Sequence, residues 1–254
     1  MAMWNPWRGC HKYSEGCRFC YIHKGDARRG VDTNVVTKAD NFCAPVERYK
    51  RGEKKGEYKM KSGETVYLCF SSDFLLPDAD EWRVECWRMM RDRSDLRFLF
   101  LTKRIERFMD CIPPDWGDGY ENVTVGCTVE NQAESYRRLP LFDTLPIVHK
   151  NIIIQPMLEK MNIERHLGDV ELVVVGGESD RNARPLDYGT HDLRFDSVSE
   201  RYGSTDISRC FETICETNRQ KPEYSDAVRS AVPRKKSVKA IFGGSPIIQT
   251  ARQL

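Results

Sequence analysis

The chain has 254 residues, enough for one large α/β domain or two small ones, of which we favour one. With 40% hydrophobic and 31% charged residues, its composition is that of an ordinary soluble globular protein. The net charge of +2 excludes neither an anionic nor a cationic partner. No apolar run reaches the roughly 18 residues that a membrane span needs, and the N-terminus lacks the apolar core of a signal peptide. We therefore expect a cytoplasmic protein with no membrane partner.

The ten cysteines divide into two groups. Three stand close together near the N-terminus, at Cys10, Cys17 and Cys20. The other seven are scattered along the chain, and several lie in apolar runs, where a reduced thiol behaves as a small hydrophobic side chain. This distribution favours a reducing compartment over a disulfide framework.

A strand is expected around Trp4 to Trp7, and the three clustered cysteines follow it. Three thiols within eleven residues, with Gly9 and Gly16 as hinges, can turn back around one metal centre. A closed zinc site needs a fourth ligand, for which the candidates are His11, His23 and Cys43. A loop of three thiolates with one open position is instead typical of a [4Fe–4S] cluster whose fourth iron binds a substrate or cofactor.

Residues 22–61 are rich in Lys, Arg, Gly and Asp and are expected to form loops. Within them, Lys50 to Lys61 alternates basic and acidic residues around Gly52 and Gly56, a pattern that predicts an exposed turn or hairpin. Two interpretations stay open for this segment. It is either a solvated loop or a basic edge that contacts a polyanion.

From residue 65 onward the chain alternates short apolar runs with helical patterns. Strands are expected at 65–70, 96–101, 122–127, 146–154 and 170–175, and helices at 80–93, 105–111 and 132–139, with a short helical link at 161–167. Near-continuous apolar strands predict a parallel sheet buried on both faces. Together with the first strand they give about six βα units, which right-handed crossovers would curl into an open, partial TIM-like barrel.

Polar residues follow the expected strands, at the edge where βα barrels gather their chemistry. They are Ser71, Ser72, Asp73, Thr102, Lys103, Arg104, Thr128, Glu130, Asn131, Gln155, Gly177 and Glu178. The cysteine loop follows the first strand to the same edge, so one cofactor could contact all of them. The alternatives are helix capping by Ser71 and Asp73, solvated charges at Lys103 and Arg104, and a tight turn at Gly176-Gly177.

Two patterns resemble a known class of enzyme. Cys17-Arg-Phe-Cys20 is similar to the Cys-x-aromatic-Cys end of the cluster loop in radical S-adenosylmethionine (SAM) enzymes, although six residues separate Cys10 from Cys17 where that family has three. More narrowly, the opening Trp4-Asn-Pro-Trp-Arg-Gly-Cys10, with Ser14, Gly16 and Tyr21, resembles a phage-encoded, radical-SAM-like family of unknown function that is distantly similar to spore photoproduct lyase. The similarity covers roughly residues 1–187, and residues 188–254 are expected to complete the barrel or dock on it.

The resemblance implies an iron–sulfur enzyme. Cys10, Cys17 and Cys20 would hold the [4Fe–4S] cluster, whose open iron would bind SAM. One electron, from a donor such as flavodoxin or ferredoxin, would break the S–C5′ bond of SAM. The resulting 5′-deoxyadenosyl radical would abstract hydrogen from an unknown substrate, for which a nucleic acid or a nucleotide is one possibility.

The resemblance also implies roles for individual side chains. Phe19 or Tyr21 would pack near the adenine or shield the cluster. The methionine carboxylate and the ribose hydroxyls would be held by the polar strand ends, namely Ser71, Ser72, Asp73, Lys103, Thr128, Glu130, Asn131, Gly177 and Glu178. Cys127 is a candidate catalytic hydrogen-atom donor, and the alternative for it is a buried, inert thiol.

Two other functions stay open: a zinc-stabilised module that binds nucleic acid, and a cluster-containing barrel without catalysis. The cluster-containing barrel without catalysis is favoured by the longer cysteine spacing and by Gln155, where the family has a carboxylate. From Arg201 to Leu254 there are ten Lys or Arg against five Asp or Glu. That tail either contacts nucleic acid or is a solvated cationic segment.

Overall fold

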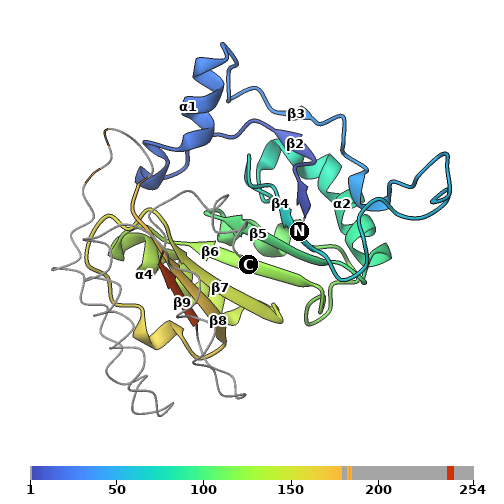
Figure 1. The fold of residues 1–254 in the computed structure, drawn as a ribbon. Helices are drawn as coiled ribbons and strands as arrows, with labels where there is room; N and C mark the ends of the chain where they lie inside the picture. Colours follow the sequence, from blue (N-terminus) through green and yellow to red (C-terminus); the bar gives the residue numbers. More distant parts are fainter. Residues whose placement is uncertain (1, 179–181, 183, 185–238, 243–254) are drawn as a thin grey trace, which may run out of the picture.

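The computed structural model describes residues 2–178, 182, 184 and 239–242, which form a mixed α/β structure (Figure 1). Its strands are β1 (Ala2–Trp4), β2 (Trp7–Arg8), β3 (Thr37–Lys38), β4 (Thr65–Leu68), β5 (Arg97–Thr102), β6 (Val123–Thr128), β7 (His149–Ile154), β8 (Val170–Val175) and β9 (Lys239–Phe242). The α-helices are α1 (Tyr21–Arg28), α2 (Asp80–Asp92), α3 (Phe108–Cys111) and α4 (Gln132–Thr144). Short 3₁₀ turns are η1 (Glu15–Cys17), η2 (Ala44–Val46), η3 (Pro77–Ala79), η4 (Ile105–Arg107) and η5 (Glu164–His166).

Seven strands form one sheet in the order β1-β4-β5-β6-β7-β8-β9, and every neighbouring pair is parallel. Six of them come from residues 2–175. The seventh, β9, lies beside β8 although a long stretch of chain separates the two (Figure 1). Strands β2 and β3 make a separate antiparallel pair. Strands that follow one another in the sheet also follow one another along the chain, so their carboxyl ends meet at one edge.

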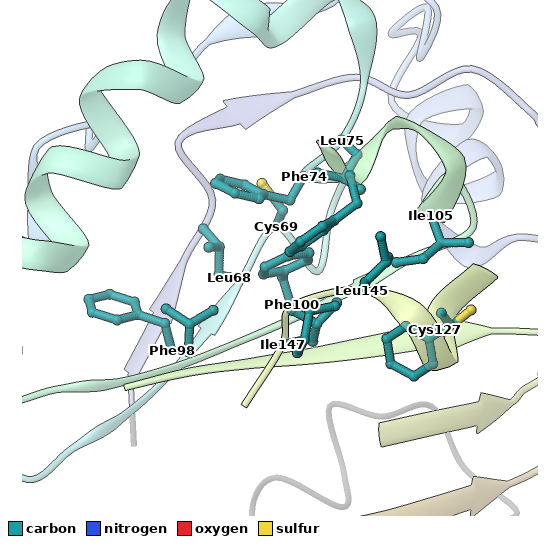
Figure 2. Packing of buried hydrophobic residues seen from close by; sticks show 14 of the residues in the cluster. Leu68, Cys69, Phe74, Leu75, Phe98, Phe100, Ile105, Cys127, Leu145 and Ile147 are labelled. Atoms are coloured by element: carbon teal, nitrogen blue, oxygen red, sulfur yellow. The ribbon is translucent and has the colours of Figure 1, made fainter. Parts of the chain in front are cut away.

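The core forms because the strands are apolar on both faces and α2 contributes an apolar stripe. Phe98 and Phe100 of β5 are fully buried, as are Cys86 and Met90 on α2. Aromatic rings fill the space between helix and sheet, and Phe74 lies at their centre, 4.8 Å from the ring of Phe100 and 5.0 Å from that of Trp87. Figure 2 shows this packing around Phe74 and Phe100. Ring pairs at these distances contribute beyond the burial of their area.

The predicted parallel α/β sheet is confirmed, with most elements within a few residues of the expected bounds. The main differences are at helices. The helix expected to end at Leu139 continues as α4 to Thr144 with Pro140 inside it, and residues 105–111 form η4 followed by the single turn α3. Helix α1 was not predicted, because Gly25 interrupts its pattern and few of its residues are apolar.

Three further expectations concern the turn at 50–61, membrane-spanning helices and the C-terminal segment. The turn predicted between Lys50 and Lys61 is present, closed by an antiparallel bridge between Arg48 and Tyr58. Among the described residues, no helix combines the length and the apolar character needed to cross a bilayer. The candidate elements at 195–199 and 209–215 and nearly all of the cationic tail lie outside the described residues.

Candidate functional site

A cavity of about 1060 Å³, counting the space at its open mouth, lies where the parallel strands end. Its wall is formed by residues that follow β4, β5, β6, β7 and β8, together with the cysteine loop. The lining residues are Cys10, Gly16, Cys17, Phe19, Cys20, Tyr21, Ile22, Cys69, Phe70, Ser72, Asp73, Leu101, Thr102, Lys103, Arg104, Thr128, Ile153, Gln155, Pro156, Gly177 and Glu178.

Most of the residues predicted from the sequence lie in this wall. The three clustered cysteines do, and so do Phe19, Tyr21, Ser72, Asp73, Lys103, Thr128, Gly177 and Glu178. Ser71, Glu130, Asn131 and Cys127 are not part of it. The backbone N–H of Ser71 donates to Asn5 Oδ1 at 3.0 Å, and the Asn131 side chain caps α4 by accepting from the Glu134 N–H at 2.9 Å.

The three clustered thiols are half-buried and close enough to influence one another. Burial raises the pKa of Cys10 to about 12, and the charges of Asp73, Cys17 and Cys20 act in the same direction. Burial also raises the pKa of Cys20, with a further contribution from Cys17. A metal centre binds thiolates, so loading this loop requires the release of protons.

The three clustered thiols line one cavity, but the candidate fourth zinc ligands do not. Within the described parts of the chain, no three His, Cys, Asp or Glu side chains are grouped so that one ion could bind them all. The proposed fourth zinc ligands are elsewhere: His11 Nε2 lies 3.0 Å from Asp78 Oδ1, Cys43 is exposed, and neither these two nor His23 lines the cavity. A cluster with one open position would require each of the three thiols to bind a different iron.

Asp73 connects two strand ends to the cysteine loop. Its Oδ1 accepts from Thr102 Oγ1 at 2.8 Å, and its Oδ2 accepts from Arg104 Nη1 at 3.0 Å. Arg104 Nη2 donates to the carbonyl oxygen of His11 at 2.8 Å. Asp73 and Arg104 are both buried, so this charged pair is screened little by water. Because its oxygens are taken up by the protein, we assign Asp73 a positioning role.

Glu130 contacts the backbone of the cysteine loop at Gly16. It is fully buried, its Oε2 accepts from Arg138 Nη1 at 2.9 Å, and its Oε1 lies 3.4 Å from the backbone N–H of Gly16. Burial alone would raise the pKa of Glu130, but Lys103 and Arg138 outweigh it and hold that pKa below its ordinary value. Glu130 was predicted to bind a cofactor. In the structure it does not line the cavity and instead contacts the backbone of the loop that carries the thiols.

Two glycine substitutions are expected to have opposite effects. A Cβ on Gly16 would lie 3.1 Å from Cδ of Glu130, which its buried hydrogen bonds hold in place, so Gly16→Ala should destabilise the fold by about 1–3 kcal/mol. A Cβ on Gly25, inside α1, has no neighbour nearer than 3.9 Å, so Gly25→Ala should stabilise by about 0.5–1 kcal/mol. Urea unfolding of both variants measures this. Equal effects at the two positions would contradict the contact with Glu130.

Glu178 and Arg184 connect the end of β8 to the cysteine loop. Arg184 donates to Glu178 from its backbone N–H at 2.8 Å and from Nη2 at 2.5 Å, and its Nη1 donates to Glu15. Burial opposes ionisation of Glu178, but the hydrogen bonds from Arg184 hold its pKa below the ordinary value. Arg184 also lies over the ring of Phe19, 6.0 Å from its centroid. Glu178 therefore faces the cavity as a carboxylate with a fixed orientation.

Cys127, the candidate hydrogen-atom donor, is placed in the core. Its side chain is fully buried among the residues of Figure 2, and burial raises its pKa to about 12. We do not carry this candidate into the proposed function. Under native conditions at pH 8, Cys127 should remain unmodified by iodoacetamide while the exposed Cys43 reacts, as read by peptide mass spectrometry. Labelling of Cys127 as fast as Cys43 would contradict this placement.

Comparison with known proteins adds one finding. The profile of a family described as a protein of unknown function (DUF5131) matches residues 1–200. The chain belongs to this family. No curated protein and no solved structure matches it. The matched range contains the cysteine loop, the strands from β1 to β8 and every residue of the cavity wall, so the site belongs to the part of the chain that the family shares.

Sequence reasoning did not identify every wall residue. Cys69 falls inside the strand expected at 65–70, but in the structure it follows β4 directly and forms part of the wall with Phe70. Its φ of 57° is in the left-handed region that residues other than glycine seldom adopt, and no sequence signal predicts that conformation here. Leu101 and Ile153 belong to the ends of strands that were correctly predicted, so alternation along β5 and β7 could have identified them.

Proposed function

We propose that this chain is an iron–sulfur enzyme of the radical SAM type, with a [4Fe–4S] cluster held by Cys10, Cys17 and Cys20. One observation carries the proposal: the three loop thiols and the polar ends of five neighbouring parallel strands line one cavity. Neither a structural zinc site nor a solvated loop requires that coincidence. The family assignment leaves the activity open, so the site must support the proposal by itself.

The strand order supports an open, partial TIM-like barrel as the finer description of the sheet. A doubly wound sheet reverses its strand order at a switch point, and its ligand binds there. The order β1-β4-β5-β6-β7-β8-β9 has no such reversal, and in barrels the active site lies at the carboxyl ends of the strands. We therefore propose about six βα units whose strand ends surround the cavity, with β9 added at one edge.

When bound, the cluster and SAM together supply reductive cleavage of the S–C5′ bond, with one electron from a donor such as flavodoxin or ferredoxin, and so hydrogen abstraction from a substrate. The chain's own residues bind, orient and exclude water. Lys103 lines the cavity with its Nζ 3.9 Å from Glu130 Oε2, longer than a hydrogen bond, and is suited to an anionic group such as the methionine carboxylate. Thr128 offers a hydroxyl to an ammonium group or to ribose hydroxyls, and Glu178, whose oxygens accept from Arg184, adds negative charge to the same wall.

Two aromatic residues beside Cys20 would shield a bound cluster from water. The hydroxyl of Tyr21 donates to the carbonyl of Phe70 at 2.5 Å, which fixes its ring at the cavity wall directly after Cys20. Phe19 directly precedes Cys20, and the guanidinium groups of Arg18 and Arg184 lie 5.2 Å and 6.0 Å from its ring centroid. Both rings are therefore positioned to keep solvent from the cluster and from the radical that SAM cleavage generates.

Lys103→Met should weaken SAM binding about 10- to 150-fold, because a charge-assisted hydrogen bond in a partly buried site is worth roughly 1.5–3 kcal/mol. Calorimetric titration of the cluster-loaded protein with SAM measures the change. Lys160→Met is the matched control, since Lys160 is exposed and does not line the cavity. Unchanged affinity in Lys103→Met would show that Lys103 does not contact SAM.

The direct test of the function is SAM cleavage. The protein, purified without oxygen and reduced with dithionite, should convert SAM to methionine and 5′-deoxyadenosine, detected by mass spectrometry, and Cys17→Ala should not. A cluster without cleavage would support the alternative of a cluster-binding barrel that lacks catalysis. Gln155 supports that alternative, because it lines the cavity where the resembled family has a carboxylate.

A further inference from the structure

Residues 47–61 form a hairpin, here called the basic arm, that none of the cavity residues belongs to. It is the light-blue loop that projects past α2 in Figure 1. Between Glu47 and Lys61 there are seven Lys or Arg and three Glu, in a chain whose net charge is only +2. A large local excess of positive charge is therefore concentrated on one small projection.

The backbone of the arm is held in a defined shape. Tyr49 N–H donates to Glu57 O at 2.9 Å, Gly56 N–H donates to Tyr49 O at 2.9 Å, and Lys59 N–H donates to Glu47 O at 2.8 Å. Gly52 and Gly56 have φ of 78° and 92°, the conformation that glycine adopts without strain. The arm thus presents its side chains from a fixed hairpin.

A buried arginine attaches the arm to the domain. Arg93, directly after α2, is only 1% exposed and donates to the carbonyl of Pro45, just before the arm, and to that of Met60, near the end of the arm. Its guanidinium also lies 3.9 Å from the ring centroid of Tyr58, and Arg48 lies 3.6 Å from the same centroid. Burying an arginine is costly unless it is well bonded, so the contacts of Arg93 fix the base of the arm firmly.

The cations of the arm point to solvent. Lys50, Arg51, Lys54 and Lys55 at the tip are all exposed. Lys59 pairs with Glu47, and Lys54 lies near the ring of Tyr49, but within the described residues Lys50, Arg51 and Lys55 make no ion pair. Like charges held this close repel one another, and an anionic partner relieves that repulsion.

We propose that the basic arm binds the phosphate backbone of a nucleic acid. Lysine is depleted at protein–protein interfaces, whereas it is a common phosphate contact on nucleic acids. The arm offers several exposed lysines and one half-exposed aromatic ring, Tyr49, with no apolar patch that a protein partner would bury. This binding surface is separate from the cavity and does not depend on the iron–sulfur chemistry.

The test is fluorescence anisotropy of the full chain with labelled mixed-sequence duplex and single-stranded DNA, over a series of salt concentrations. For the wild type, the logarithm of the affinity for duplex should fall linearly with the logarithm of salt concentration. The variant Lys50→Gln, Arg51→Gln, Lys55→Gln should bind at least tenfold more weakly at low salt. Its salt slope should be smaller by about two to three, since each phosphate contact contributes about 0.9.

A matched control removes the same charge elsewhere: Arg88→Gln, Lys160→Gln, Arg165→Gln, all at exposed positions outside the arm. Its affinity should stay within about twofold of the wild type. Equal losses in both variants, or no loss in the arm variant, would overturn the proposal. The proposal would also be overturned if the wild type bound polyglutamate but no nucleic acid, and the arm variant lost the binding to polyglutamate. The iron content and the unfolding midpoint of both variants should match the wild type.

Discussion

Replacing Cys17 with alanine is expected to reduce bound iron from about four atoms per chain to near zero, with loss of the broad visible absorption of the cluster. The same result is expected for Cys10→Ala and Cys20→Ala, because the three thiols face one cavity and each would bind a separate iron. Iron and sulfide analysis after oxygen-free purification, together with the visible spectrum, measures the change.

Two other cysteines give sharp controls. Cys43→Ala should retain the iron, because Cys43 is exposed and lies outside the cavity wall. Cys69→Ala should also retain it, although Cys69 is in the wall. If Cys69→Ala lost its iron as completely as Cys17→Ala, four thiols would close the cluster. No iron would then be open to SAM, and the proposed chemistry would be wrong.

Asp73→Ala should lower the free energy of unfolding by about 3–5 kcal/mol, the largest effect on stability expected here. The substitution leaves the guanidinium of Arg104 buried without its carboxylate, and it removes the acceptor of Thr102 Oγ1. The cysteine loop should loosen as well, because Arg104 holds the carbonyl of His11. Urea unfolding measures the stability, and iron content measures the state of the loop.

An exposed ion pair provides the comparison for Asp73. Asp115 pairs with Arg91 at 2.6 Å at the surface, where both side chains are about half exposed, so Asp115→Ala should cost less than about 1 kcal/mol. A loss at Asp73 no larger than at Asp115 would contradict the account of a buried, desolvated pair. It would also remove Asp73 from the set of residues that position the cysteine loop.

The sheet could be predicted because its signals are local. Val170 to Val175 and Arg97 to Thr102 are apolar runs bounded by polar residues, and such runs identify buried parallel strands by themselves. Once the strands are parallel, their carboxyl ends share an edge, so Asp73, Lys103 and Glu178 could be brought together without a structure. The spacing of Cys10, Cys17 and Cys20 is equally local.

The supporting contacts could not be predicted, because they join residues far apart in the sequence. Nothing near Gly16 indicates that it approaches Glu130, 114 residues later. Arg93 looks like one more charge at a helix end, yet it is buried and fixes the base of the arm through Pro45 and Met60. Helix α1 was also missed, because its own sequence has weak helix propensity.

The measurement that tests the central claim most directly is metal analysis of the wild-type chain purified without oxygen. The account predicts about four iron atoms and four sulfides per chain, with a brown colour and broad absorption near 400 nm. About one zinc per chain and a colourless protein would contradict it. The three thiols would then hold a structural zinc ion that stabilises a binding protein, and the cavity would not support radical chemistry.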